Sequence, residues 1–285
     1  MSDNVSHQDK TRSKVGITAH LVASGRAAEN AKEDGLFKDP YAHLLGVTPE
    51  MEASLPVVDS YRAEGRTAEN DRASYDACAV RTRKIDDEFA RFLKETPKAQ
   101  IVALGAGLDT RAFRLNIIPR PGVTTSSTSY FELDFPEIFD FKLPVLAQAG
   151  AVATFDYHSV AADLSLPGWI EKLTAAGFDA SVPTFWLLEG FTGYLTETEF
   201  HSLFDTLTEL SAPCSRVVAT FLTPATETFV NLHRFRPAVP IDEVTRHAGW
   251  AGAQEDIRAV ALTYNRPIGG TRHNGYFFVI ADYNK

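Results

Sequence analysis

After residue 98 the sequence alternates short apolar runs with longer stretches of helical periodicity. The apolar runs, which we predict to be strands, are QIVALG (100–105), SYFELD (129–134), ATFDYHSVAADL (153–164), TFWLLEG (184–190) and SRVVATFL (215–222). Strands separated by helical segments form βαβ units, whose strands are parallel. The alternation therefore predicts an α/β fold built on a mostly parallel sheet.

The end of the chain carries a different signal. The apolar runs AVALTYN (259–265) and GYFFVIADY (275–283) are joined by RPIGGTRH, which is too short for a crossover helix. We predict that they pair as an antiparallel hairpin at the sheet edge, which gives seven strands in all. A dinucleotide-binding domain would normally continue with parallel strands, so the hairpin counts against one.

Residues 13 to 95 show helical periodicity interrupted by turns. The helical stretches are TAHLVASGRAAENA, DPYAHLLG and the long ASYDACAVRTRKIDDEFARFLKE. We therefore predict two parts, a helical N-terminal cap at 1–98 and a catalytic core at 99–285.

Composition excludes several classes of protein. The formal net charge is −9, with 28 Lys and Arg against 37 Asp and Glu, so a nucleic-acid partner is not expected. Cys78 and Cys214 have no metal or disulfide spacing, which argues against a zinc site and fits a reducing cytoplasm. The polar N-terminus lacks a signal sequence and no apolar run reaches spanning length, so we expect a soluble cytoplasmic protein without a membrane partner.

The first predicted strand ends at Gly105-Ala106-Gly107, where a ligand would bind in a doubly wound sheet. Glycines there allow a tight turn and close approach to a ligand, and Asp109 or Thr110 is placed to cap a following helix. Thr110 stands where the third glycine of a dinucleotide pattern would be, and no phosphate-binding lysine follows. A pyrophosphate is therefore disfavoured, while a turn without any ligand remains the alternative.

The next two strands end in acids. Glu132 and Asp134 end the second strand, where a carboxylate accepts hydrogen bonds from ribose hydroxyls; a solvated acid is the alternative. Asp163, followed by Leu164, ends the third, where the pair suits an adenine ring; a helix N-cap is the alternative.

Glu189 ends the fourth strand after mostly apolar residues, so burial would be costly without a cation. A sulfonium or a substrate ammonium would supply one, and a structural ion pair is the alternative.

Arg81 and Arg83 lie on the helix before the first strand. At i and i+2 they point to different faces, so at most one turns into a cleft, where it would bind a carboxylate.

Seven stretches together resemble the leucine carboxyl methyltransferase-like family of S-adenosylmethionine-dependent methyltransferases. They are LFKDPYAHLL (36–45), VRTRKIDD (80–87), VALGAGLDTRAFRL (102–115), YFELDFPEIFDFK (130–142), ADL (162–164), LLEGFTGYLTETE (187–199) and HAGW (247–250). They occur in the family's order and cover most of the chain.

The resemblance implies a Rossmann-like class I methyltransferase fold with a helical N-terminal cap, and S-adenosyl-L-methionine as the cofactor. It implies cofactor contacts through Arg81, Gly105, Asp134, Asp163, Leu164 and Glu189, and so selects Asp134 over Glu132. The segment SKVGITAHLVASGRAAENAKEDGLF (13–37) is closer to the bacterial and natural-product members than to the protein-directed branch. Lysine contacts of that branch are not carried over, and a protein substrate is less favoured.

The family methylates carboxylates, either on a protein's C-terminal leucine or on small molecules. A carboxylate, with a pKa of about 4, is ionised at neutral pH and needs no base, whereas a phenol, with a pKa of about 10, needs one. The motif GFTGYLTETEF (190–200) contains no His or Lys. We therefore predict an O-methyltransferase that forms a methyl ester on a small-molecule carboxylic acid, with Phe191 and Tyr194 lining the substrate pocket.

Other functions stay open at this point. A phenol or hydroxyl acceptor would need a base, for which His273 in GGTRHNGY is a candidate, and a protein carboxyl acceptor is less favoured. An NAD-dependent oxidoreductase and a non-catalytic ligand-binding protein are the rivals from other classes. No catalytic residue is predicted, and a homodimer is the candidate assembly.

Overall fold

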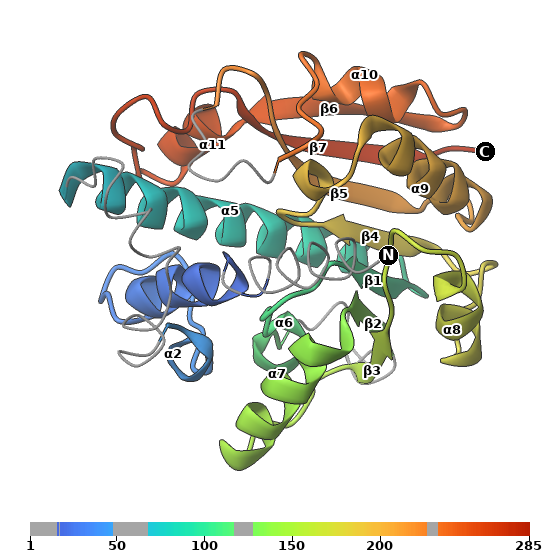
Figure 1. Ribbon diagram of the computed structural model, residues 1–285, viewed down its shortest axis with the longest axis horizontal. Helices are drawn as coiled ribbons and strands as arrows, with labels where there is room; N and C mark the ends of the chain where they lie inside the picture. Colours follow the sequence, from blue (N-terminus) through green and yellow to red (C-terminus); the bar gives the residue numbers. More distant parts are fainter. Residues whose placement is uncertain (1–15, 17, 48–67, 117–127, 227–232) are drawn as a thin grey trace, which may run out of the picture.

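The computed structural model describes residues 16, 18–47, 68–116, 128–226 and 233–285. Within these ranges, seven strands form one sheet in the order β3-β2-β1-β4-β5-β7-β6 (Figure 1). The strands are β1 (Gln100–Leu104), β2 (Ser129–Asp134), β3 (Asp156–Ala161), β4 (Thr184–Leu188), β5 (Arg216–Leu222), β6 (Trp250–Asp256) and β7 (Tyr276–Tyr283).

Strands β1 to β5 are parallel to one another, and β7 runs antiparallel between β5 and β6. Every residue of β1 and of β4 is buried, as expected for central parallel strands that are covered on both faces. The predicted class I methyltransferase fold, a mostly parallel seven-stranded sheet with an antiparallel strand at the C-terminus, is therefore confirmed.

The predicted first strand of that hairpin is wrong. Residues 259–265 lie largely in helix α11 (Ile257–Thr263), and the strand that pairs with β7 is β6, farther upstream. Ile257, Val260 and Ala261 are buried at helical spacing, and the side chain of Asp256 accepts a hydrogen bond from the N–H of Arg258 as the N-cap. An apolar run of this length does not by itself distinguish a strand from a helix.

Strand β6 gave no clear sequence signal because it is an edge strand of small, exposed residues. Ala251, Gly252 and Ala253 are exposed, so the strand shows no alternation of apolar and polar residues. A Cβ atom at Gly252 would lie 2.1 Å from the carbonyl oxygen of Ile280 on β7, so the pairing itself requires glycine there.

Helices cover both faces of the sheet (Figure 1). Helix α5 (Ala68–Glu95) and α11 pack on one face, where Phe89 of α5 contacts the rings of Tyr130 and Phe185. Helices α8 (Trp169–Ala175), α9 (Glu197–Glu209) and α10 (Pro240–Thr245) pack on the other face. Helix α9 begins with a capping box, in which Thr196 and Glu199 bond each other's backbone N–H.

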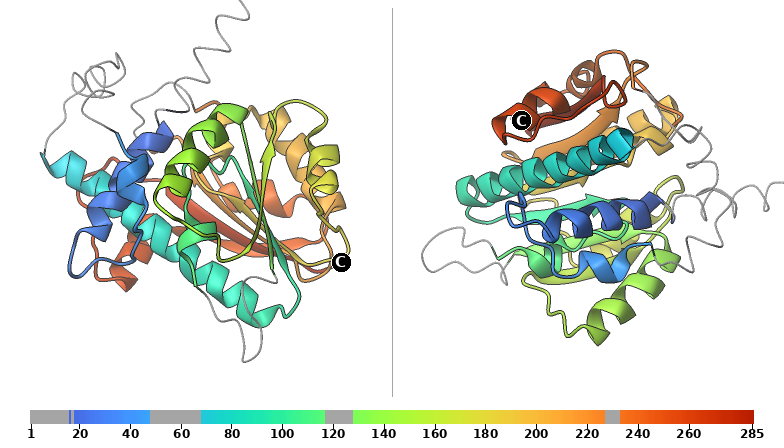
Figure 2. Two further views of the ribbon diagram at one scale, coloured as in Figure 1. Left: turned by 90° about the horizontal axis from the view of Figure 1, so that it is seen from below. Right: turned by 90° about the vertical axis from the view of Figure 1, so that its left-hand side faces the viewer.

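The remaining elements lie at the carboxyl edge of the parallel strands. They are a helix over residues 18–30, α2 (Ala42–Leu45), α6 (Arg111–Arg114), α7 (Pro136–Gln148) and the 3-10 helix η2 (Thr192–Tyr194). The helix over 18–30 lies beside α5 (Figure 2), and a Cβ atom at Gly25 would lie 3.0 Å from Sγ of Cys78. The same helix reaches the turn after β1, since a Cβ atom at Gly107 would lie 3.4 Å from Cβ of Ala19.

The division into a cap at 1–98 and a core at 99–285 stays a prediction. Helix α5 precedes that boundary and contributes directly to the sheet's hydrophobic core. In the part of the chain that the structure describes, no helix combines the length and the apolar character that crossing a membrane requires.

Candidate active site

The glycine turn after β1 is bonded to the neighbouring strand. Gly105 and Gly107 have φ angles of +66° and +53°, which glycine adopts without the steric cost that other residues carry. The N–H groups of Gly105 and Ala106 donate to the carbonyl oxygen of Leu133 over 2.9 and 3.1 Å. A Cβ atom at Gly105 would lie 2.6 Å from Cδ2 of Phe191, so the phenyl ring covers the turn.

Asp134, at the end of β2, is the acid that this turn contacts. Its Oδ2 accepts a hydrogen bond from the N–H of Gly107 over 2.6 Å, and its Oδ1 accepts one from the N–H of Phe135 over 2.7 Å. Burial raises the pKa of Asp134, and the two backbone bonds oppose that rise. Because each carboxylate oxygen has two acceptor lone pairs, Asp134 retains acceptor capacity toward a ligand.

Glu132, the other acid of β2, is held in a buried ion pair. Its Oε2 lies 2.6 Å from Nζ of Lys142 and accepts a hydrogen bond from the hydroxyl of Tyr157 over 2.7 Å. Both Glu132 and Lys142 are fully buried. Burial raises the pKa of Glu132, and the charge of Lys142 opposes that rise. This structural role leaves Asp134 as the acid of β2 that faces the glycine turn.

Asp163 lies in the turn after β3, next to Asp134. The N–H of Ala162 donates to the carbonyl oxygen of Asp134 over 2.8 Å. Oδ1 of Asp163 accepts hydrogen bonds from the N–H and the hydroxyl of Ser165, over 3.0 and 2.6 Å. The helix-cap alternative does not hold, because α8 begins at Trp169 and Gly168 is its N-cap. The predicted contact of Asp163 and Leu164 with adenine stays a prediction.

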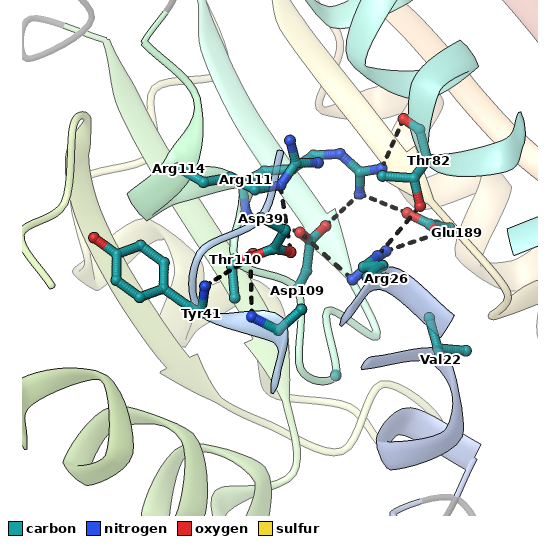
Figure 3. Close-up of polar contacts among 12 residues, drawn as sticks. Val22, Arg26, Asp39, Tyr41, Thr82, Asp109, Thr110, Arg111, Arg114 and Glu189 are labelled. Carbon is teal, nitrogen blue, oxygen red and sulfur yellow. Dashed lines mark hydrogen bonds and ion pairs between the residues drawn. The ribbon is translucent and has the colours of Figure 1, made fainter. Parts of the chain in front are cut away.

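Glu189 follows β4 and lies among three arginines (Figure 3). Its Oε1 lies 2.9 Å from Nη2 of Arg26 and 2.7 Å from Nε of Arg81, and its Oε2 lies 2.5 Å from Nη1 of Arg111. Burial alone would raise the pKa of Glu189, but the charges of Arg111, Arg26 and Arg81 outweigh burial and lower it to about 2. The ion-pair interpretation of Glu189 is confirmed, and its contact with the cofactor stays a prediction.

Arg111 connects this cluster to further carboxylates. Its guanidinium lies 2.5 Å from Oδ2 of Asp109 and 2.7 Å from Oδ1 of Asp86, and the side chain is fully buried. Figure 3 shows the guanidinium between Asp109 and Glu189. Asp109 also accepts a hydrogen bond from the N–H of Arg111 over 2.9 Å, so of the two predicted capping residues Asp109 bonds the helix. The hydroxyl of Thr110 donates instead to Asp39 over 2.6 Å.

The arginines of α5 divide as their spacing predicts. Arg81 turns into the site, where its Nη1 also donates to the hydroxyl of Tyr276 over 3.2 Å. Arg83 points away, bonding Asp87 over 2.9 Å and the carbonyl oxygen of Leu36 over 2.8 Å. Only Arg81 is therefore available to the site.

Tyr194 lies on η2, close to Arg81. Its hydroxyl lies 3.0 Å from Oγ1 of Thr18 on the N-terminal helix, and its ring centroid lies 5.4 Å from that of His233. Burial raises the pKa of Tyr194, and among the opposing influences is the charge of Arg81. Tyr194 is thus on the Arg81 side of the site, whereas Phe191 lies over the glycine turn. Their roles in substrate binding stay predictions.

Comparison with known proteins identifies the family of this chain. The family model described as leucine carboxyl methyltransferase matches residues 19–208. The chain belongs to the leucine carboxyl methyltransferase family. This assignment confirms the resemblance seen in the sequence, and with it the methyltransferase class and the S-adenosyl-L-methionine cofactor.

Relatives of this family member come from mycobacteria. A Mycobacterium ulcerans protein named "Putative S-adenosyl-L-methionine-dependent methyltransferase" is 37% identical over 266 residues, which cover 88% of this chain and 75% of that protein. A Mycobacterium marinum protein of the same name is 39% identical over 218 residues, which cover 73% of this chain and 63% of that protein.

Solved structures support the fold of this family member. A DUF574 family protein from Streptomyces avermitilis superposes with a TM-score of 0.60 at 15% identity, covering 85% of this chain and 95% of that one. A Thermobifida fusca protein, titled as a putative methyltransferase, gives a TM-score of 0.53 at 19% identity, covering 80% of this chain and 94% of that one.

The residues of this family member fit the cofactor. Glycines at 105 and 107 let the backbone approach a ligand, and Asp134 keeps acceptor capacity beside them. The side chain of Arg81 is 14% exposed, and a guanidinium group is suited to binding a ligand carboxylate.

Several residues of the site were missed by the sequence reasoning. Arg26, Arg111 and Tyr276 all contact the cluster around Glu189 and Arg81. Arg111 follows directly from the glycine turn, and its pairing with Asp109 at i and i+2 was a readable signal. Arg26 and Tyr276 carried no signal, since each reaches the site only through the tertiary fold.

Proposed function

We propose that this protein transfers the methyl group of S-adenosyl-L-methionine to the carboxylate of a small molecule and so forms a methyl ester. The proposal is supported by the low basicity of the titratable side chains described around Arg81 and Tyr194. Burial, together with the charges of Arg272, Arg81 and Arg258, lowers the pKa of His273 to about 4. The pKa of His233 is also lowered, by burial and by Arg236.

Because their pKa values are lowered, His273 and His233 are weak bases, which disfavours a methyl acceptor that must lose a proton. Glu189 is held ionised by arginines, so it too is a weak base. A phenol has a pKa of about 10, and general bases work best when their pKa is near the operating pH. A carboxylate acceptor is already ionised and needs none of these groups to take a proton.

The chain's residues have separate tasks in this reaction. Asp134 would bind the ribose hydroxyls, Asp163 and Leu164 the adenine ring, and Arg81 with the Gly105 turn the amino-acid end. When bound, the cofactor supplies an electrophilic methyl group on a cationic sulfur. The acceptor carboxylate oxygen donates the electron pair of the new O–CH₃ bond, and the electron pair of the broken S–CH₃ bond stays on sulfur, so no proton is released.

The remaining task is orientation without water. The helix over residues 18–30 lies on the glycine turn through Ala19 and reaches Tyr194 through Thr18. Holding two reactants in line supplies roughly 7–11 kcal/mol of such a barrier. We assign this holding and water-excluding role to that helix and to Tyr194.

A labelling experiment tests the proposal. The full chain is incubated with methyl-labelled S-adenosyl-L-methionine and a panel of carboxylic acids and phenols, and each product is treated with base. Methyl esters release labelled methanol under base, whereas methyl ethers keep the label. We expect base-labile label from at least one acid and none from the phenols.

Two outcomes contradict the proposal. Base-stable label alone identifies a phenol or hydroxyl acceptor. Tight cofactor binding measured by calorimetry, with no label transferred to any compound, identifies a protein that binds the cofactor without catalysis. The Asp134→Asn variant is the control that links any observed transfer to this site.

A further inference from the structure

The carboxyl edge of the parallel strands continues past β4 onto β5 and β7. The predicted cofactor residues Gly105, Asp134 and Asp163 follow β1, β2 and β3, and Glu189 follows β4. Beyond Glu189, the same edge of the sheet is formed by the end of β5 and, because β7 is antiparallel, by its beginning, since Leu222 pairs with Tyr276. The residues that precede β7 therefore lie at the same edge of the sheet as Glu189.

These residues form a fixed turn. The carbonyl oxygen of Gly275 accepts hydrogen bonds from the N–H of Thr223 and the hydroxyl of Thr226, both over 2.9 Å. Gly275 has a φ of +71°, and a Cβ atom there would lie 2.1 Å from Oγ1 of Thr223. Nε of Arg236 donates to the carbonyl oxygen of Thr223 over 3.1 Å. The turn before β7 is thus fastened to the turn after β5.

His273 lies in this turn and is linked to Arg81 through Tyr276. The N–H of Tyr276 donates to the carbonyl oxygen of His273 over 3.4 Å, and the hydroxyl of Tyr276 accepts from Nη1 of Arg81. The charge of Arg81 influences the pKa of both His273 and Tyr194. Tyr194 is the residue that the sequence assigns to the substrate pocket.

The imidazole of His273 has an unused polar atom. Its Nε2 is buried and has no hydrogen-bond partner. A buried polar atom without a partner is unfavourable, and native proteins seldom keep one without a ligand or water that satisfies it. The hydrogen bonds of Gly275 and Arg236 fix the turn that contains His273.

The charges around His273 indicate what would satisfy it. Burial and the guanidinium groups of Arg272, Arg81 and Arg258 lower its pKa to about 4, so the ring is neutral at physiological pH. A neutral imidazole carries one N–H donor. A donor in a region of positive potential favours an anionic partner over a neutral one.

We propose that His273 binds the methyl acceptor, with its Nε2–H donating a hydrogen bond to the acceptor's carboxylate, and thereby selects carboxylates over neutral hydroxyl compounds. This role rests on the proposed ester-forming function. It makes His273 an acceptor-binding residue and not a base, because a carboxylate has no proton to give up.

The test compares two variants of the full chain on an acid that the wild type esterifies. His273→Leu removes the donor, and His273→Gln keeps an N–H donor. A hydrogen bond to a charged group corresponds to a change of about tenfold or more in affinity. We expect His273→Leu to raise KM for the acid by about tenfold or more with kcat nearly unchanged, and His273→Gln to stay close to the wild type.

Two further readouts separate binding from a structural role. His43→Gln, at an exposed position of α2, is the matched control and should leave KM unchanged. In ¹⁵N NMR of the protein saturated with S-adenosylhomocysteine, the His273 Nε2 resonance should shift when the same acid is added. The pH profile of kcat should be the same in wild type and His273→Gln.

The outcomes distinguish this inference from the proposed function. A wild type that forms esters while His273→Leu keeps the wild-type KM overturns the inference and leaves the function standing. An unmoved His273 resonance at saturating acid does the same. A wild type that forms only base-stable methyl ethers, with kcat lost in His273→Gln, overturns both and makes His273 a base.

Discussion

The phenyl ring of Phe191 occupies the space into which a side chain at Gly105 would project. A Cβ atom at position 105 would lie 2.6 Å from Cδ2 and 2.9 Å from Cγ of that ring. Phe191, two residues after Glu189, therefore closes over the turn after β1, and this contact joins the ends of two neighbouring strands, β1 and β4. Glycine at 105 is required twice, by its positive φ and by this close approach.

Replacing this glycine should therefore cost more than backbone strain alone. Gly105→Ala should destabilise the fold by about 1–2 kcal/mol for the positive φ and by about 1–3 kcal/mol more for the overlap with Phe191. The free energy of unfolding in urea is the measurement. The cofactor Kd, measured by calorimetry, should rise as well, because the ring must move at the predicted methionine end of the site.

Gly150→Ala is the matched control for this substitution. Gly150 has a φ of +70° but no atom within 4 Å of its Cβ position, so only the strain should appear. Adding Phe191→Ala to Gly105→Ala should recover part of the excess loss. Equal losses of unfolding free energy in Gly105→Ala and Gly150→Ala would show that the ring of Phe191 moves aside without cost in stability.

Asp134→Asn should weaken cofactor binding about tenfold or more, on the order of 1.4 kcal/mol. The amide replaces one carboxylate oxygen by a donor, while the carboxylate now accepts from Gly107 and Phe135 and is predicted to accept from the ribose. Calorimetric Kd for S-adenosyl-L-methionine is the measurement. Asp140→Asn, at an exposed position of the following helix, should bind like the wild type, and equal affinity in both variants would remove Asp134 from the site.

The pattern of apolar residues along the sequence predicts most of the strands, but it does not predict every contact of the site. The run TFWLL coincides with the strand over Thr184–Leu188 because a central strand buried on both faces requires consecutive apolar residues. The predicted strand over residues 259–265 is wrong because a short apolar run fits the periodicity of a strand as well as that of a helix. The signal that favours the helix is Asp256, which is its N-cap. The contacts of Glu189 with Arg26 and Arg81 depend on how distant helices pack, which no local pattern encodes.

Arg111→Met should be strongly destabilising. The guanidinium is fully buried and pairs with carboxylates of Asp86, Asp109 and Glu189, and its removal leaves buried negative charges without their partner. Breaking a buried ion pair in this way costs about 3–5 kcal/mol. Urea unfolding at pH 7 is the measurement.

Arg72→Met is the matched control for that loss. The side chain of Arg72 is 85% exposed and lies 3.8 Å from Asp76, and exposed pairs contribute about 0–1 kcal/mol. A loss of similar size in both variants would mean that the Arg111 cluster adds little to the stability of the fold.

The stability of the protein should fall as pH drops from about 5 toward 2, in part because of Glu189. Its pKa is about 2 in the fold and near 4.3 when unfolded, so in that range the unfolded chain binds the proton first. The sign is therefore a loss of stability with acid, amounting to about 3 kcal/mol for this group. Glu132 and Asp134, whose pKa values are raised, act in the opposite direction.

Comparison with Glu189→Gln isolates the effect of Glu189. This variant is less stable at pH 7, but its free energy of unfolding should fall less steeply below pH 5. Glu171→Gln, at an exposed position of α8, should keep the wild-type slope; the same slope in Glu189→Gln would contradict the assignment.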